Sequence, residues 1–251
     1  MKPYCLEVCA DSVESALEAQ KGGADRIELC GNLVIGGVSP GRALFRLVKK
    51  YTDLEVRVLL RPRYGDYCYN DYEFEQLKEE VELYRELGAD GVVIGMLRPD
   101  GALDVERMRE LISLAGHMDV ALHRAFDICK DPFEALEEAV SLGMKTILTG
   151  GQEVVAWEGR EILAKLQKKS AGRIQILAGG GIGEDVIRKL LPVTEITSYH
   201  MSGKRRVDSA MKYRRDGAGM GQPGQDEFAL WRTDGEKVAA AVDALKELTQ
   251  H

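Results

Sequence analysis

A short pattern recurs along the chain, in which a glycine, a second residue and a charged residue precede an apolar run. The clearest copies are Gly23–Asp25, Gly88–Asp90 and Gly143–Lys145, and looser ones begin at Gly116 and Gly172. Glycine is favoured just after a helix because it adopts the left-handed conformation without a Cβ clash. Each copy therefore predicts a joint from a helix to a strand. Helices that alternate with short apolar strands are typical of a parallel α/β sheet.

Eight segments have the character of such strands. They are Cys5–Val8, Asp25–Leu29, Glu55–Leu60, Gly91–Ile94, Val120–His123, Thr146–Leu148, Arg173–Ala178 and Glu195–Tyr199. Helical patterns lie between them, among them Asp71–Leu87, Asp104–Ala115 and Pro132–Leu142. Eight βα units in 251 residues favour a (β/α)8 TIM barrel, a single domain over residues 1–251 closed by the helix Asp234–Leu248. An open doubly wound sheet is the alternative.

Composition limits the classes of partner. The formal net charge is −7 and the pI about 5.3, which argues against nucleic acid and against an anionic membrane surface. No run of eighteen apolar residues is present, and the first residues lead directly into a strand. Five cysteines spread over a chain of this size are typical of reduced thiols in a cytoplasmic protein.

The alternation of side chains along each strand predicts which residues face the barrel lumen. Charged residues fall on the lumen side, whereas a barrel interior is usually filled by branched apolar side chains. At the carboxyl ends of the strands, where barrels carry their chemistry, we expect Glu7, Glu28, Arg61 and His123, joined by His200 at the end of the eighth strand. The deeper Arg26 and Arg57 are expected to pair within a polar layer. His200 has an equal alternative as a hydrogen-bonded core histidine.

Glycines follow the sixth and seventh strands, in Leu148–Gly151 and Ala178–Gly183. Backbone N–H groups without side chains can cradle an anion, helped by the N-terminus of a following helix. This pattern predicts an anion or phosphate site made by Thr149, Gly150, Gly151, Gly180 and Gly181. Tight turns alone are the alternative.

Two cysteines, Cys9 and Cys30, end adjacent strands on the lumen side. Soft thiolates select Cu(I) or Zn, which makes the pair candidate metal ligands. The alternative is that both are small core side chains, since no C-x-x-C motif or histidine cluster accompanies them.

A long segment, Met201–Arg232, separates the eighth strand from the last helix. It is basic at Lys204–Arg206 and rich in glycine at Gly217–Gly224. Irregular insertions of this length are usually binding loops or mobile segments, so a lid over the barrel mouth and a mobile surface loop stay equal predictions.

Several of these stretches together resemble the CutC family of copper homeostasis proteins over almost the whole chain. The stretches are Leu6–Cys9, Gly22–Cys30, Arg61–Arg63, Gly65–Tyr69, His123–Asp127, Leu148–Gln152, Ala178–Gly181 and Met211–Arg214. The resemblance implies a cytoplasmic, homo-oligomeric TIM barrel that binds copper, with Cys30 as a copper thiol and Cys9 as a less certain one. The chain departs from the family pattern at Gly150, where serine is expected, at Val34–Pro40 and at the basic stretch Lys204–Arg206.

Two classes of function follow. The resemblance implies a protein that binds copper through Cys30, with Cys9 as a second candidate thiolate. The charged residues favour an enzyme, in which Glu7, Glu28 and His123 exchange protons and Arg61 stabilises negative charge on a small polar or phosphorylated substrate. An isomerase, aldolase or lyase fits such a site, without a Schiff base because no lysine lies at a lumen position. A sensor that binds the same ligand without turnover is a third possibility.

Overall fold

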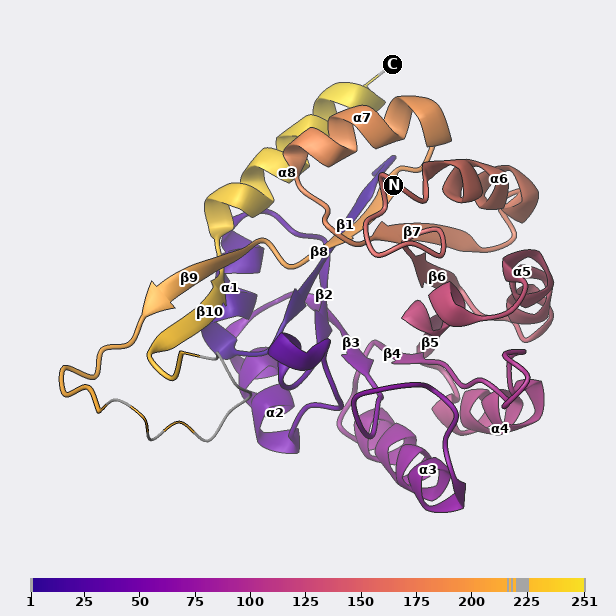
Figure 1. The fold of residues 1–251 in the computed structure, drawn as a ribbon, viewed down its shortest axis with the longest axis horizontal. Helices are drawn as coiled ribbons and strands as arrows, with labels where there is room; N and C mark the ends of the chain where they lie inside the picture. Colours follow the sequence, from indigo (N-terminus) through magenta and orange to yellow (C-terminus); the bar gives the residue numbers. More distant parts are fainter. Residues whose placement is uncertain (1, 216, 218, 220–225, 251) are drawn as a thin grey trace.

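The computed structural model describes residues 2–215, 217, 219 and 226–250. Eight parallel strands close into a barrel in sequence order, with β8 paired to β1 (Figure 1). They are β1 (Cys5–Ala10), β2 (Arg26–Leu29), β3 (Glu55–Leu59), β4 (Gly91–Ile94), β5 (Asp119–Leu122), β6 (Thr146–Thr149), β7 (Gln175–Gly179) and β8 (Ser198–Met201). The predicted (β/α)8 barrel is confirmed, and the open sheet is excluded by the β1–β8 pairing.

Helices surround the barrel between successive strands. They are α1 (Val13–Lys21), α2 (Arg42–Tyr51), α3 (Asp71–Glu86), α4 (Val105–Ala115), α5 (Pro132–Ser141), α6 (Arg160–Ser170), α7 (Glu184–Thr194) and α8 (Gly235–Thr249), with short 3-10 turns η1 (Leu33–Ile35) and η2 (Arg124–Ile128). Local sequence explains their starts. Asn70 and Glu73 form a capping box at α3, and Asp131 caps α5 ahead of its first-turn proline, Pro132.

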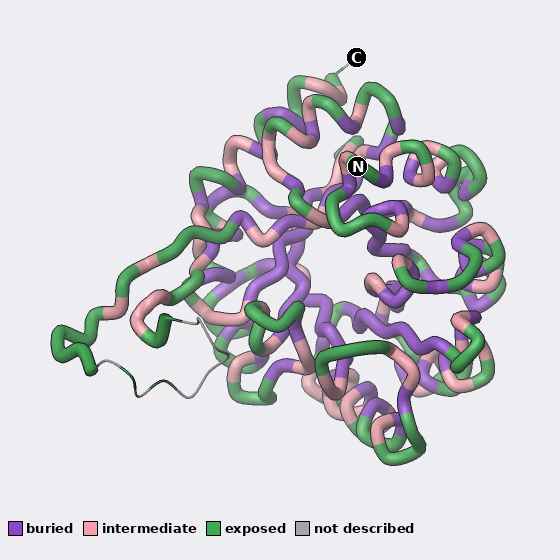
Figure 2. Tube along the Cα trace, in the orientation of Figure 1, coloured by how far each residue is buried: buried purple, intermediate pink, exposed green. Residues whose placement is uncertain are grey.

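The main apolar core lies between the barrel and its helices (Figure 2). Alternate strand residues such as Leu6, Val8, Ile27 and Leu29 are fully buried in it. These side chains point away from the lumen, so the intervening residues line the inside of the barrel, as the alternation predicts.

Two buried arginines, Arg26 and Arg57, lie in the lumen of the barrel and form ion pairs with carboxylates. Arg57 donates hydrogen bonds to Glu55, Asp119 and Thr146. Arg26 donates to Glu7 and to Gln175. The predicted polar layer around Arg26 and Arg57 is therefore present, and both of these arginines already have the partners that a buried charge requires.

The long segment after β8 differs from the irregular loop expected. Strand β9 (Lys204–Asp208) pairs antiparallel with β10 (Ala229–Thr233) as a separate two-stranded sheet that projects beside the barrel (Figure 1). The sequence did not predict this pairing because β9 is mostly charged and exposed, and neither strand alternates between apolar and polar residues. Most of Gly217–Gly224, to which the lid and loop predictions refer, lies outside the described residues.

Strand β8 begins later than predicted, at Ser198, and His200, which was expected to end this strand, lies one residue before its last residue, Met201. Among the described residues, no helix combines the length and the apolar character needed to cross a membrane.

Candidate functional site

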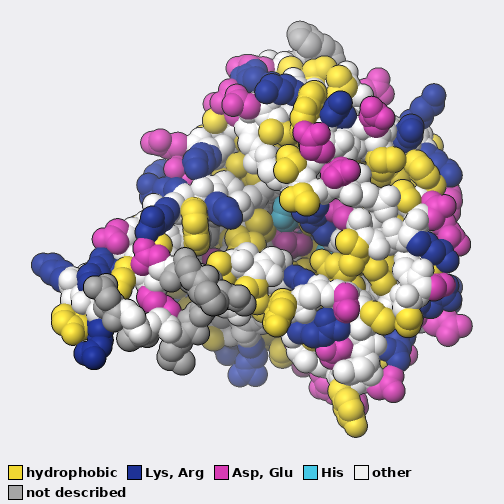
Figure 3. Space-filling view, in the orientation of Figure 1, with side chains coloured by type: hydrophobic (Ala, Val, Ile, Leu, Met, Phe, Trp, Pro, Cys, Tyr) yellow, Lys and Arg dark blue, Asp and Glu magenta, His cyan; other side chains and the backbone are white. Residues whose placement is uncertain are grey.

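A cavity opens at the carboxyl ends of the barrel strands. Its volume is about 390 Å³. Figure 3 shows the hollow near the centre of this face, with histidine and acidic side chains at its floor. It is lined by Cys9, Glu28, Leu33, Ile35, Gly36, Leu59, Arg61, Tyr67, His123, Arg124, Asp127, Ile128, Leu148 and His200.

A hydrogen-bonded chain of Arg26, Glu7 and His200 lies at the floor. The register of β1 places Glu7 beside Arg26 of β2 and His200 of β8. Arg26 Nε lies 2.5 Å from Glu7 Oε2, and His200 Nδ1 lies 2.8 Å from Glu7 Oε1. Burial alone would raise the pKa of Glu7, but the charges of Arg26 and His200 outweigh it and lower this pKa to about 2. Glu7 is therefore an ionised group that holds His200 in place.

Glu28, on the neighbouring strand β2, has surroundings that shift its pKa in the opposite direction to that of Glu7. Its Oε2 atom lies 3.9 Å from His200 Nε2, and no arginine forms an ion pair with it among the described residues. Burial, together with the charge of Glu7, raises the pKa of Glu28 to about 7, against the attraction of His200. Ligand atoms of Glu7, Glu28 and His200 all lie within 4.8 Å of one another, which is a spacing that a metal ion can bridge.

His200 is the centre of this cluster. Burial disfavours its charged form, but Cys9, Glu28 and Glu7 raise its pKa well above the ordinary value. A histidine whose Nδ1–H donates to a carboxylate presents Nε2 for a metal or a proton. His200 Nε2 faces Glu28, and because the pKa of His200 is raised, a metal ion would bind at Nε2 in exchange for a proton.

The two candidate thiols have different surroundings. Cys9 lies beside Glu28 in the β1–β2 register, lines the cavity and donates a hydrogen bond from its thiol to the carbonyl of Met201. Cys30 is fully buried in a small apolar cluster with Leu59, Val93 and Ala121. Burial raises the pKa of the Cys30 thiol well above its ordinary value, which favours the thiol over the metal-binding thiolate. The Cys9 thiol is therefore the one placed to reach a ligand in the cavity.

His123 lies on the opposite wall, directly after β5. Its Nδ1 accepts a hydrogen bond from the backbone N–H of Ala125 at 3.1 Å, which assigns the proton of the neutral ring to Nε2. Burial, and then the charge of Arg61, lower the pKa of His123 to about 3. The ring is therefore neutral at physiological pH, and its Nε2–H is a hydrogen-bond donor.

The Arg61 guanidinium lies near His123, and the Tyr67 ring packs against both. The Tyr67 centroid is 4.7 Å from that of His123 and 4.9 Å from Arg61 Cζ. Arg61 donates to three backbone carbonyls, those of Gly36, Gly37 and Gly65. It forms no ion pair with any residue that the structure describes.

The backbone N–H groups that follow β6 are hydrogen-bonded to a side chain of the protein itself, Asp127, which was not predicted from the sequence. Asp127 accepts hydrogen bonds from the N–H groups of Gly150 and Gln152 and from the hydroxyl of Thr149. Thr149 in turn accepts from Gly151 N–H. The anion that these donors were expected to bind is thus a carboxylate of the chain itself. Asp127 ends the stretch His123–Asp127, which was singled out from the sequence. Its position next to β6 depends on the folded loop and could not be predicted from that stretch.

The glycines after β7 lie beside those after β6, because a Cβ atom on Gly150 would be 3.1 Å from the carbonyl oxygen of Gly179, and Gly150 and Gly180 both lie against the Arg124 guanidinium. Gly181 lines a second hollow of about 340 Å³, with Gly183 at the start of α7, Ser202 and Lys204. Gly180 accepts a hydrogen bond from Ala156 N–H through its carbonyl. Gly150 and Gly180 therefore lie close together as predicted, whereas Gly181 lines the second hollow.

Close packing explains why glycine, and not serine, stands at position 150. A Cβ atom there would lie 2.5 Å from the carbonyl oxygen of Glu153, so the serine expected at this position would not fit without movement of the backbone.

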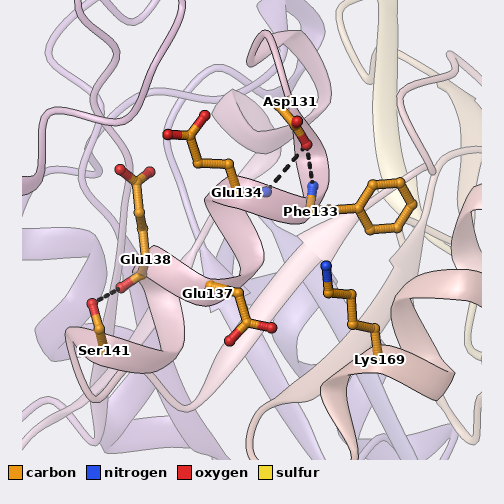
Figure 4. Close-up of a pocket in the computed structure, with 7 residues that line it drawn as sticks. All are labelled: Asp131, Phe133, Glu134, Glu137, Glu138, Ser141 and Lys169. Carbon is orange, nitrogen blue, oxygen red and sulfur yellow. Dashed lines mark hydrogen bonds between the residues drawn. The ribbon is translucent and has the colours of Figure 1, made fainter.

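A shallow groove of about 560 Å³ lies outside the barrel, between α5 and α6 (Figure 4). Its acidic residues have local structural roles. Asp131 accepts from the N–H groups of Phe133 and Glu134 as the cap of α5, and Glu137 pairs with Arg173. The groove shares no residue with the cavity of the barrel.

Comparisons with known proteins agree with this fold. The model of the CutC family matches residues 4–205. A family protein CutC of Chromobacterium violaceum is 41% identical over 96% of this chain and 97% of its own length. The human copper homeostasis protein cutC homolog is 40% identical over 94% of this chain and 86% of its own. The crystal structure of the putative copper homeostasis protein CutC from Streptococcus agalactiae superposes with a TM-score of 0.76 at 27% identity, covering 79% of this chain and 98% of that one.

Proposed function

Because the chain belongs to the CutC family, we propose that it binds a copper ion in the mouth of its barrel. The human and mouse relatives carry copper homeostasis in their names. In this proposal copper is the cargo of the protein and not a resident cofactor. The observation that carries the proposal is the cluster of buried ligand atoms of Glu7, Glu28 and His200, next to which Cys9 lines the same cavity.

The donor atoms fit copper. Cys9 offers sulfur, His200 offers Nε2, and Glu28 offers a carboxylate oxygen. Thiolate and imidazole are ligands that copper accepts readily. Glu7 is not a ligand in this proposal but orients one, because its hydrogen bond to Nδ1 of His200 holds the imidazole with Nε2 toward Glu28. Cys30 is left out of this ligand set because it lies in the apolar cluster.

The test is a titration of the reduced protein with Cu(I) against a competing chelator. Loss of a ligand should weaken binding by at least about 100-fold, since loss of an outer partner alone costs about 10- to 100-fold. We expect this loss in Cys9→Ala and not in Cys30→Ala, a matched change at the end of the adjacent strand. Equal affinities in the wild type and Cys9→Ala would refute the ligand set.

A second function is supported by a different observation. Glu7 and Glu28 have pKa values of about 2 and about 7, and such separation of neighbouring carboxyl groups is typical of acid–base catalysis. An isomerase or lyase acting beside a carbonyl would use Glu28 as the proton carrier. The test follows deuterium uptake from D2O into small carbonyl compounds by NMR. Uptake should be catalysed by the wild type and lost in Glu28→Gln; uptake that persists in this variant would exclude Glu28.

We also propose, from the family resemblance and the free cysteines, that the protein is cytoplasmic and homo-oligomeric. Light scattering measures the mass directly. A mass of 27.8 kDa in dilute solution would contradict the oligomer.

A further inference from the structure

The wall of the cavity opposite Cys9 and His200 carries two buried hydrogen-bond donors without partners. Among the described residues, neither Arg61 Nε nor His123 Nε2 has a hydrogen-bond partner. Arg61 is 8% exposed and His123 is 3% exposed. Polar groups buried in this way are costly, and native proteins leave few of them unless a ligand or water completes the site.

The charge of Arg61 is also uncompensated. Its other nitrogens donate to backbone carbonyls, which hold the guanidinium in place without neutralising it. Arg26 and Arg57, which also face the lumen, each pair with carboxylates. A buried charge without a counter-ion is unfavourable, so the site of Arg61 is suited to an anion that comes from outside the chain.

The carboxylates that share this cavity are engaged elsewhere. Asp127 pairs with Arg124 and accepts from the amides after β6. Glu28 lies against His200, on the other side. Arg124 is matched by Asp127, which leaves Arg61 as a single positive charge, and the neutral His123 adds a donor without adding charge.

We propose that Arg61 and His123 form a subsite for the carboxylate of a small organic molecule. One cation and one neutral donor match a monoanion with two acceptor oxygens, whereas a phosphate dianion would leave excess negative charge. The cavity of about 390 Å³ is large enough for a small organic ligand and much larger than one metal ion requires. Tyr67 packs against both donors and forms part of the wall of this subsite.

Binding at this subsite is measured by calorimetry on metal-free protein, so its result does not depend on the copper proposal. The probes are acetate, pyruvate and benzoate, with inorganic phosphate for comparison. At least one carboxylate should bind more tightly than phosphate. Loss of a hydrogen bond to a charged group should reduce its affinity about tenfold or more in Arg61→Met and in His123→Asn. Arg63→Met is the matched control, because Arg63 pairs with Asp66 and Glu73 outside the cavity.

A second readout does not require the variants to fold. In the wild type, the signals of the His123 ring nitrogens should move when the carboxylate binds, with Nε2 more affected than Nδ1, which stays bonded to Ala125. The proposal is overturned if no carboxylate binds, if phosphate binds more tightly, if the His123 signals do not move, or if folded Arg61→Met binds as the wild type does.

Discussion

Glu7 and Glu28 are the same residue type on adjacent strands and both are buried, yet their pKa values are shifted in opposite directions. The difference comes chiefly from one neighbour, because Arg26 forms its ion pair with Glu7 and not with Glu28. Strand alternation was enough to predict that both face the lumen. It could not predict which of them meets the arginine, since that depends on the register of β1 and β2.

Substitution of each glutamate by glutamine should separate the two roles. Glu7→Gln leaves Arg26 buried without its counter-ion and should reduce the free energy of unfolding by roughly 3–5 kcal/mol. Glu28→Gln removes a carboxylate that burial disfavours and should leave stability at pH 8 unchanged or increased. Urea denaturation of both variants at pH 8 measures this. Equal losses in the two variants would contradict the pairing described for Arg26.

At the scale of elements, the loop after β6 shows what sequence reasoning could and could not reach. The glycines correctly indicated a concentration of backbone N–H donors. The occupant, Asp127, belongs to η2 after the preceding strand and arrives only through the fold. Cys30 is similar, because its position at a strand end was predictable, but its packing against Leu59 depends on the barrel around it.

Removal of Asp127 should turn this loop into a true anion site. Asp127→Ala leaves the N–H groups of Gly150 and Gln152 and the Thr149 hydroxyl without their acceptor, which should cost roughly 2–3 kcal/mol of stability. Added phosphate should restore part of this loss by binding to the freed amides. Thermal unfolding with and without phosphate measures the effect. A wild type stabilised by phosphate as much as the variant would argue against Asp127 as the occupant.

For the whole molecule, closure of the ring creates the site. His200 meets Glu7 only because β8 pairs with β1, which joins residues 193 positions apart. The repeated helix-to-strand pattern predicted the barrel, and the barrel implied that strand ends would converge. The hydrogen bonds between them, and the β9–β10 sheet beside the barrel, depend on contacts that periodicity does not contain.

The buried carboxyl groups should also shape the pH dependence of global stability. The pKa of Glu28 is raised in the folded state to about 7, so its protonated form is favoured by folding. This stabilisation is complete below the unfolded pKa of about 4.5 and is lost as the pH rises through about 7. The pKa of Glu7 is lowered, so its contribution is present above about 4.5 and is lost as the pH falls toward about 2.

We therefore expect metal-free wild type to lose stability relative to Glu28→Gln between pH 5 and pH 8, by on the order of 3 kcal/mol at most. Denaturation curves of the two proteins at several pH values give this difference. Parallel curves throughout that interval would contradict the raised pKa of Glu28.

The most direct test of the copper site is a crystal of the reduced protein grown with Cu(I) and measured at the copper absorption edge. The account predicts an anomalous peak in the barrel mouth, bonded to Cys9 Sγ and His200 Nε2 and next to Glu28. A peak at Cys30, or no peak among these three side chains in crystals that contain copper, would contradict it.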